Sequence, residues 1–429
     1  MDGSPEGRGY HTKVLPPSLS DDERVAAIRE LLPATSAGIY LNTGSVGPLP
    51  AETAAAMDEI ATQELRTGRG HPDYWLETLE RFAEARASLA AVLATDIDAI
   101  ALTHSTTDGI NTAVLALPWQ AGDRVLTTNQ EHAGVLGPLL SLRDRVGVEV
   151  VLVDVGEGRD DEATVRAFEK ALERPARALV FSHVLWTTGA LLPVERIAAL
   201  GRERRAVTIL DAAQSVGAMP VHPDDIGVDA LALPAQKWLL GPEGMGGLWL
   251  SQAARRSTPA LGGYLTYETI DRTGAGRRHP SGRRFESTTF HRPSVVGFAR
   301  SLGWLAMSVG LPWAFERGVR QARSAAERLR AIPGVTVITP RDRMATLVSF
   351  QVARWPGEQA YEELSSRTFA IMRHVPDVDA LRISVGFWNT DAELDRLAEG
   401  VALLAAHAPH TLEPRRRLTV LGADGRSLG

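Results

Sequence analysis

The chain has 429 residues, of which 44% are hydrophobic and 23% charged, and a net charge of −6. A chain of this length and composition forms two or three core-bearing units, and its charge gives no reason to expect nucleic acid or an anionic membrane as a partner. Cysteine is absent, which excludes disulfides, thiolate metal sites and a persulfide relay on the chain itself.

The hydropathy pattern contains no membrane segment or signal peptide. No uninterrupted apolar run is long enough to span a bilayer. The first residues, MDGSPEGRGYHTK, lack the apolar core of a signal peptide. We therefore expect a cytoplasmic protein without a membrane partner.

Short apolar runs recur between residues 100 and 250, and helical patterns separate most of them. Runs of this length are typical of buried strands. Strands that alternate with helices form a mostly parallel sheet that is covered on both faces. The sequence therefore predicts an α/β fold with a seven-stranded, mostly parallel sheet, built from residues 100–103, 124–127, 148–153, 178–182, 207–210, 230–233 and 247–250.

The pattern changes after Gly263, where an irregular, arginine-rich stretch begins. A long helix over about 311–331 then leads into a smaller α/β unit, whose last helix opens with a capping box of Thr390 and Glu393. We divide the chain into an N-terminal arm and helix (1–40), a large domain (41–295), a small C-terminal α/β domain (296–412) and a tail (413–429).

The segment Val207–Leu250 carries the strongest chemical signal. An apolar run ends on Asp211, and the next run leads to Lys237 and a glycine-rich turn. A lysine amine can form a Schiff base with the aldehyde of pyridoxal 5′-phosphate (PLP), and a carboxylate can keep its pyridine nitrogen protonated. We assign these roles to Lys237 and Asp211, against the alternative of a surface lysine and an aspartate that caps a helix.

Three motifs of this segment carry a resemblance to a known family. DAAQ–x–VG begins at Asp211, GVDAL begins at Gly227, and QKWLLGP–x–G–x–G begins at Gln236. They resemble the class V aminotransferase group of fold-type I PLP enzymes, which includes cysteine desulfurases, selenocysteine lyases, kynureninases, isopenicillin N epimerase-like proteins and C–S lyases. The resemblance extends from about Tyr40 to about Leu404 and implies a seven-stranded mixed sheet.

A PLP site also needs a cradle for the phosphate. The strand at 100–103 runs into Thr103–Gly109, and a helical pattern follows. A helix N-terminus offers unpaired N–H groups and a positive dipole end, and hydroxyl groups add donors. We predict Thr106 and Thr107 as phosphate contacts; the alternative is a helix N-cap without a ligand.

The resemblance implies further contacts to the cofactor. His132 matches a histidine that stacks on the PLP ring, and Gln214 matches a glutamine that reaches the phenolic oxygen. Gln236 stands before the lysine, where the family often has a histidine, and Pro234 replaces a hydroxyl residue two positions earlier. We keep Gln236 as a cofactor contact, although an amide cannot serve as an acid or base.

The resemblance also implies substrate contacts and a shared site. Arg382 matches an arginine that grips the substrate carboxylate, a task that suits its planar fork. Asn42 is a candidate contact in an N-terminal loop, and Trp186 stands where the family often has an asparagine, as a wall for a larger substrate. Thr289, with Thr288 as the alternative, matches a threonine donated to the phosphate of the neighbouring subunit, so a homodimer is expected.

These residues predict a PLP enzyme acting on a small amino acid, with no metal site. We favour C–S bond cleavage by β-elimination on a cysteine S-conjugate, resembling the PLP enzymes of sulfur-containing antibiotics such as lincosamides. Epimerisation, decarboxylation or oxidative deamination of the same type of substrate are alternatives, and transamination is less favoured. A non-catalytic PLP-fold module is also open. A nucleotide-binding enzyme is disfavoured because no G-x-G-x-x-G follows the first strands.

Overall fold

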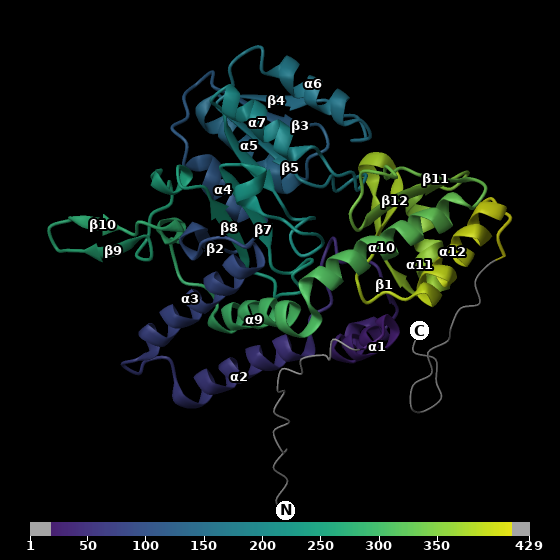
Figure 1. The fold of residues 1–429 in the computed structure, drawn as a ribbon, viewed down its shortest axis with the longest axis horizontal. Coiled ribbons are helices and arrows are strands. Elements are labelled where there is room, and N and C mark those ends of the chain that lie inside the picture. The colour runs from purple at the N-terminus through teal and green to yellow at the C-terminus, as the bar shows by residue number, and fades with distance from the viewer. Residues whose placement is uncertain (1–18, 414–429) are drawn as a thin grey trace, which may run out of the picture.

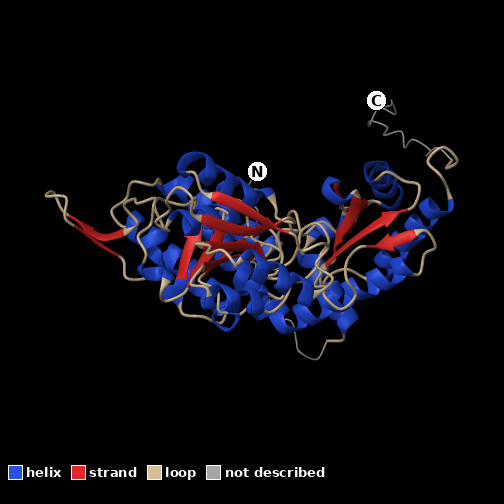
Figure 2. Ribbon diagram, turned by 90° about the horizontal axis from the view of Figure 1, so that it is seen from above, coloured by secondary structure: helices blue, strands red, loops and turns tan. Residues whose placement is uncertain are grey.

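The computed structural model describes residues 19–413 of the 429. Most of the predicted N-terminal arm and nearly all of the predicted tail lie outside the described residues. Figures 1 and 2 show an elongated molecule with a larger and a smaller sheet side by side, each accompanied by helices. The predicted α/β class is confirmed.

The larger sheet has seven strands in the order β2-β8-β7-β6-β5-β3-β4. All of them run in one direction except β8, which is antiparallel to both of its neighbours. The seven predicted strands and their mostly parallel arrangement are thus confirmed. The strands are β2 (Ile100–Thr103), β3 (Arg124–Thr128), β4 (Glu149–Val153), β5 (Ala178–Ser182), β6 (Val207–Asp211), β7 (Ala230–Pro234) and β8 (Gly246–Leu250).

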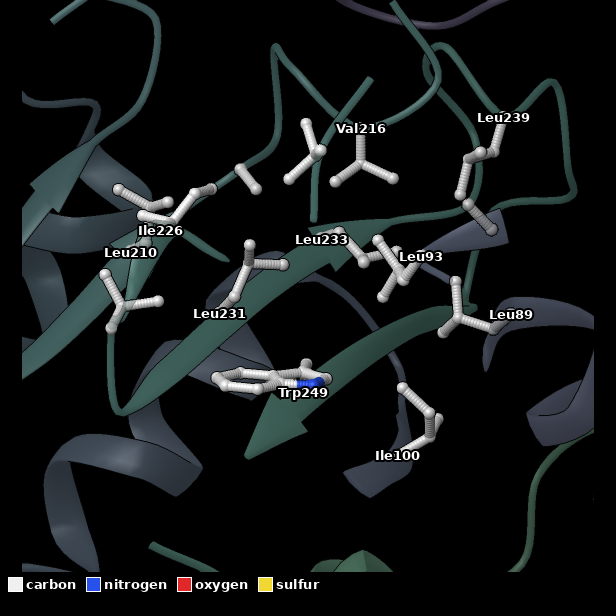
Figure 3. Packing of buried hydrophobic residues seen from close by; sticks show 14 of the residues in the cluster. Leu89, Leu93, Ile100, Leu210, Val216, Ile226, Leu231, Leu233, Leu239 and Trp249 are labelled. Carbon is white, nitrogen blue, oxygen red and sulfur yellow. The ribbon is translucent and has the colours of Figure 1, made fainter. Parts of the chain in front are cut away.

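The central strands are apolar throughout because side chains on both faces of the sheet are buried. Leu210, Leu231 and Leu233 enter one hydrophobic cluster, together with Trp249 of β8, as Figure 3 shows. Intervening residues such as Ile209 pack into a second cluster. Because successive side chains of a strand point to opposite faces, both faces of the sheet are buried. The helices that follow the strands in the chain are α4 (Thr106–Leu115), α5 (Ala133–Val146), α6 (Asp161–Ala171), α7 (Val194–Glu203) and α8 (Pro223–Ile226).

Long helices connect the two sheets (Figure 1). Helix α9 packs against both α2 and α3, then passes through the π-helical segment Trp304–Val309 into α10. The predicted domain boundary at residue 295 falls inside α9. The helices of this layer are α1 (Asp21–Leu31), α2 (Ala51–Thr67), α3 (Tyr74–Val92), α9 (Arg292–Gly303) and α10 (Leu311–Arg330). Within residues 19–413 no single helix could cross a bilayer; α9 and α10 meet the length and hydropathy criteria only together, with an 83° bend between them.

The region expected to be irregular contains a hairpin that projects from the body (Figure 1). Strands β9 (Tyr267–Ile270) and β10 (Gly276–Arg278) pair antiparallel. The Asp271 side chain accepts N–H groups of Thr273 and Ala275 and so closes the turn. The sequence analysis missed this hairpin because its strands show no apolar alternation. The turn is instead determined by hydrogen bonds to a side chain.

The smaller sheet is antiparallel, in the order β11-β12-β15-β14. It packs with α10, α11 and α12 around its own hydrophobic core. The capping box of α12 is confirmed, since Thr390 Oγ1 accepts the Glu393 N–H at 3.3 Å and the Glu393 carboxylate accepts the Thr390 N–H at 3.1 Å. The elements are β11 (Val335–Val337), β12 (Leu347–Val352), α11 (Gly357–Thr368), β14 (Arg373–Val375), β15 (Ala380–Ser384) and α12 (Asp391–Ala406), with β1 (Ile39–Tyr40) paired to β13 (Ala370–Ile371) beside them.

Candidate active site

A cavity of about 250 Å³ lies where the two sheets face each other. Its walls come from the carboxyl ends of β5, β6 and β7, the N-terminus of α4, and strands β14 and β15 of the smaller sheet. Open α/β sheets bind ligands at this edge. The lining residues are Gly44, Ser45, Ser105, Thr106, Thr107, His132, Gly134, Ser182, Val184, Trp186, Asp211, Ala213, Gln214, Pro234, Gln236, Lys237, Arg373 and Arg382.

The loop that carries Lys237 connects β7 to β8 and is tightly fixed. Gly47 donates its N–H to the Gln236 carbonyl at 2.7 Å, and a Cβ on Gly47 would come within 2.3 Å of the Lys237 carbonyl oxygen. A Cβ on Gly217 would meet the Trp238 backbone at 2.6 Å. Leu240 adopts a left-handed conformation with φ of 53°, which is strained for a leucine. Two glycines therefore allow the close approach that holds the lysine in place.

The environment of Lys237 favours a neutral amine. Burial lowers the pKa of Lys237 to about 8, against the opposing effect of Asp211. The positive charges of Arg382 and Arg373 lower this pKa further. Near neutral pH an appreciable fraction of the amine is thus unprotonated and nucleophilic.

Asp211 lies at the end of β6 and is only 7% exposed. Its Oδ1 accepts the Ala213 N–H at 2.8 Å. Burial raises the pKa of Asp211, while the charge of Lys237 opposes that rise. A carboxylate in such a site gains from a cationic partner, and the protonated ring nitrogen of PLP is one.

The N-terminus of α4 forms another wall of the cavity. Ser105 caps the helix by accepting the Asp108 N–H at 3.1 Å. Helix geometry leaves the N–H groups of Thr106 and Thr107 without acceptors inside the helix, and both residues line the cavity. The site therefore offers N–H groups, hydroxyls and a positive helix end to an anion.

His132 and Trp186 meet edge to face, with ring centroids 5.2 Å apart. His132 Nδ1 accepts the Gly134 N–H at 3.0 Å, so the neutral ring carries its proton on Nε2. Burial, followed by the charge of Lys237, lowers the pKa of His132 to about 4. His132 therefore offers a neutral ring face and is only a weak base.

The two glutamines of the site differ in their hydrogen bonds. Gln214 donates to the Gly44 carbonyl at 2.8 Å and accepts from Trp238 Nε1 at 3.0 Å. Among residues 19–413, Gln236 Oε1 and the Trp186 indole nitrogen are buried without a hydrogen-bond partner. Buried polar atoms rarely stay unpaired. Because both residues line the cavity, a ligand is the natural source of their partners.

The smaller sheet contributes two guanidinium groups. Arg373 of β14 and Arg382 of β15 are register partners, and both approach Ser45 Oγ, at 3.3 and 3.5 Å. Arg382 also donates to the Trp186 carbonyl at 2.8 Å, and burial lowers its pKa to about 9. Within the described part of the chain neither arginine forms an ion pair with a carboxylate. Two cations with only neutral acceptors form an anion site.

Three predicted residues lie outside the cavity wall. Asn42 forms an isolated bridge with Ser384, and Ser45 of the same loop lines the cavity. Thr288 and Thr289 are exposed on the surface, and the Thr289 N–H donates to the Tyr264 hydroxyl at 3.1 Å. The role of Thr289 in a neighbouring subunit stays a prediction.

The structure adds Arg373, Ser45 and Ser182 to the residues inferred from the sequence. Arg373 had a recognisable signal, since an arginine nine positions before Arg382 falls on the adjacent strand of a tight antiparallel pair. Ser182 had only its place at a strand end. No cluster of three or more metal-ligating side chains occurs among residues 19–413.

Comparison with known proteins agrees with this geometry. The family model described as Aminotransferase class-V matches residues 39–397. The chain belongs to the class V aminotransferase family. PLP is the cofactor of this class V enzyme, and the buried lysine, the buried carboxylate and the anion-binding helix end fit that group.

Curated relatives of the class V enzyme include proteins named cysteine desulfurase and proteins named isopenicillin N epimerase. A probable cysteine desulfurase of Methanothermobacter thermautotrophicus is 25% identical over 399 residues, 89% of this chain and 98% of the relative. An isopenicillin N epimerase of Streptomyces clavuligerus is 28% identical over 385 residues, 85% of this chain and 94% of the relative.

Solved structures share the fold. The cystine C–S lyase C-DES, in complex with its product cysteine persulfide, aligns with a TM-score of 0.81 at 24% identity, over 86% of this chain and 99% of that one. The apo cysteine desulfurase of Thermococcus onnurineus aligns with a TM-score of 0.78 at 22% identity, over 89% and 98% of the two chains.

Proposed function

We propose that this class V enzyme is a PLP-dependent C–S lyase that acts on a cysteine S-conjugate by β-elimination. The observation that carries the proposal is the cavity itself: Lys237 is its one basic group suited to proton transfer, and the chain has no cysteine to receive sulfur. The sulfur therefore leaves on a small molecule.

Each lining residue has a distinct task in this reaction. Bound PLP supplies an electron sink for the carbanion that forms at Cα of the substrate. Arg382 and Arg373 bind the α-carboxylate, and Asp211 keeps the ring nitrogen protonated. The N-terminus of α4 binds the phosphate.

The proton inventory balances around Lys237. Its neutral amine removes the proton from Cα, and the Cβ–S bond then breaks with its electrons leaving on sulfur. The resulting ammonium returns the proton to the departing thiolate. The remaining 2-aminoacrylate is hydrolysed to pyruvate and ammonia.

The geometry around His132 favours elimination over epimerisation. Epimerisation needs an acid on the face of the substrate opposite Lys237. His132 accepts the Gly134 N–H on Nδ1 and, as a neutral imidazole, is a poor acid. The remaining lining side chains are hydroxyls, amides, arginines and apolar groups besides Asp211. The named epimerase relative nevertheless makes epimerisation the second candidate.

The wall at Trp186 supports a substrate with a large sulfur substituent. This indole contacts His132 and lies under the Arg373 guanidinium, 5.7 Å from it. We assign the reaction to the biosynthesis of a sulfur-containing natural product such as an antibiotic, an assignment supported by the relative that is named an isopenicillin N epimerase.

We also propose that the enzyme is a homodimer with a shared site. Thr288 and Thr289 are exposed, while the segment that carries them is firmly anchored: Glu286 pairs with Arg86 at 2.9 Å, and Phe290 stacks on His104 with centroids 4.6 Å apart. An anchored segment with exposed hydroxyls is suited to binding a neighbour's phosphate. An enzyme that sediments as a monomer and is nevertheless fully active would contradict this assignment.

The cofactor assignment is tested first with Lys237→Ala. We expect loss of the borohydride-sensitive visible band and a fall in turnover of at least about 10³-fold, because both the covalent link and the base are removed. A coloured and active Lys237→Ala enzyme would rule out the assignment.

The reaction type is tested with a series of S-substituted cysteines, such as S-methylcysteine, S-benzylcysteine and cystine. We expect stoichiometric pyruvate and free thiol or persulfide, with alanine as a control that lacks a leaving group. Exchange of the α-hydrogen in heavy water with inversion of configuration, and without pyruvate, would instead identify an epimerase.

A further inference from the structure

A second buried carboxyl lies behind the wall of the cavity. Glu131 precedes α5 and is only 5% exposed, but it is not part of the cavity lining. Its Oε1 accepts the Thr128 hydroxyl at 2.7 Å and the Ser182 N–H at 3.0 Å. Its Oε2 lies 2.5 Å from the Ser182 hydroxyl, and Ser182 does line the cavity.

Ser182 connects this carboxyl to the one that is assigned to the PLP ring nitrogen. Ser182 ends β5 and is the register partner of Asp211 at the end of β6. Glu131 and Asp211 are thus two buried acids on either side of one serine. The negative charge of Asp211 disfavours the ionised form of Glu131.

The surroundings determine which acid keeps its proton. Asp211 has the positive charge of Lys237 nearby, while Glu131 has only neutral donors and the like charge of Asp211. Its neighbour His132 is neutral near pH 7. Burial, with a further contribution from Asp211, raises the pKa of Glu131 to about 7.

We propose that Glu131, acting through the Ser182 hydroxyl, is a positioning residue that takes up a proton more readily than Asp211, so that Asp211 carries the negative charge beside the PLP ring nitrogen. Protonated Oε2 donates to Ser182 Oγ, which frees the serine hydrogen to turn into the cavity. The inference rests on the assignment of Asp211 to the ring nitrogen, and it is independent of whether the reaction is an elimination or an epimerisation.

The test uses Glu131→Gln, which keeps the shape and a donor toward Ser182 but cannot ionise. We expect its affinity for PLP, measured at pH 6, to stay within about threefold of wild type, because protonated Glu131 and glutamine are both neutral at that pH. The matched variant Ser182→Ala should lower PLP affinity about tenfold, since it removes the hydrogen-bonding hydroxyl that lines the cavity. A loss of more than about tenfold in Glu131→Gln would overturn the proposal, because it would show that the negative charge is needed.

A second readout detects the influence on the ring nitrogen itself. With PLP labelled with ¹⁵N in the ring, the wild-type nitrogen signal should show a titration step near pH 7 as Glu131 ionises. The step should be absent in Glu131→Gln. If Glu131 acted through packing alone, neither the wild-type nor the Glu131→Gln nitrogen signal would show a step near pH 7. A wild-type signal without the step, or the same step in Glu131→Gln, would contradict the proposal. No substrate is present, so failure here leaves the proposed C–S lyase activity untouched, and failure of that activity leaves this result standing.

Discussion

Arginines lie at both ends of the strands of the seven-stranded sheet, but in opposite circumstances, and those at the carboxyl ends come from the smaller sheet. At the amino ends of β3 and β5, Arg124 donates to the Ala171, Arg174 and Pro175 carbonyls at 2.7–3.3 Å, and Arg177 forms a two-pronged pair with Asp123. In the cavity at the other edge, Arg373 and Arg382 have only neutral acceptors.

The direction of the helices explains the difference. Helices that connect parallel strands run against them, so their carbonyl ends lie at the amino edge of the sheet and their N–H ends at the carboxyl edge. Arg124 at the carbonyl end of α6 neutralises partial negative charge. Arg382 adds positive charge to an edge that already has the N-terminus of α4. The first arginine contributes to the fold, and the second leaves charge available for a ligand.

Among the variants that distinguish the arginines of the cavity from those at the amino ends of the strands, Arg382→Gln should have the largest effect on activity. Losing a buried charged hydrogen-bond partner of a carboxylate costs about 2–5 kcal/mol, so kcat/KM for an amino acid should fall about 30- to 5,000-fold. Steady-state kinetics would measure this. Thermal stability should be nearly unchanged, because no carboxylate inside the described chain loses its partner. A large loss of stability with kinetics intact would reverse the comparison.

The pH dependence of cofactor capture sharpens the comparison next. Only neutral Lys237 reacts with the PLP aldehyde, and its pKa is lowered to about 8 from 10.5. The rate of appearance of the visible band in cofactor-free enzyme should therefore rise with pH and level off above about 8. In Arg382→Gln the pKa of Lys237 should rise, because one neighbouring cation is removed, and the midpoint should move to higher pH. An identical midpoint in both proteins would contradict the described electrostatics.

Substitution of Trp186 should have a smaller effect that depends on the substrate. Trp186→Phe keeps a ring against His132 but removes the unpaired indole N–H. We expect KM for a large S-conjugate to rise about tenfold or less, because one hydrogen bond is lost. KM for S-methylcysteine should change little. Equal effects on both substrates would show that Trp186 does not contact the sulfur substituent.

Arg177→Gln at the amino edge should have the smallest effect. The pair with Asp123 is partly exposed, so its loss should cost about 1 kcal/mol or less of unfolding free energy. Denaturant unfolding would measure this loss, and kcat/KM should equal that of wild type. A kinetic defect here would show that the far edge is coupled to the cavity.

The sequence predicted the fold well because the signals were local. Apolar runs such as Val207–Leu210 fixed the seven strands, and the motifs around Asp211 and Lys237 placed two residues that the structure brings into one cavity. Strand ends at one edge of a parallel sheet meet by geometry alone, so the sequence was sufficient for this part of the site.

The remaining residues depend on contacts between distant segments. Arg373 enters the cavity because β14 and β15 pair in one register, and Glu131 became visible only through its hydrogen bonds to Ser182. Asn42 was predicted as a substrate contact, but it bridges to Ser384, and Gly44 and Ser45 of the same loop line the cavity. Tertiary contacts of this kind leave no periodicity or motif in the sequence.

The segment Ile39–Gly47 joins parts of the molecule that are otherwise far apart. It pairs with β13, bridges to Ser384 beside the arginine strand, and ends at Gly47, which holds the Gln236 carbonyl. These few residues work as a strap between the subunit's two halves. Truncating the chain beyond Ile39 to aid crystallisation would therefore disturb both the arginine strands that bind the carboxylate and the loop that carries Lys237. Any N-terminal truncation should stop before Ile39.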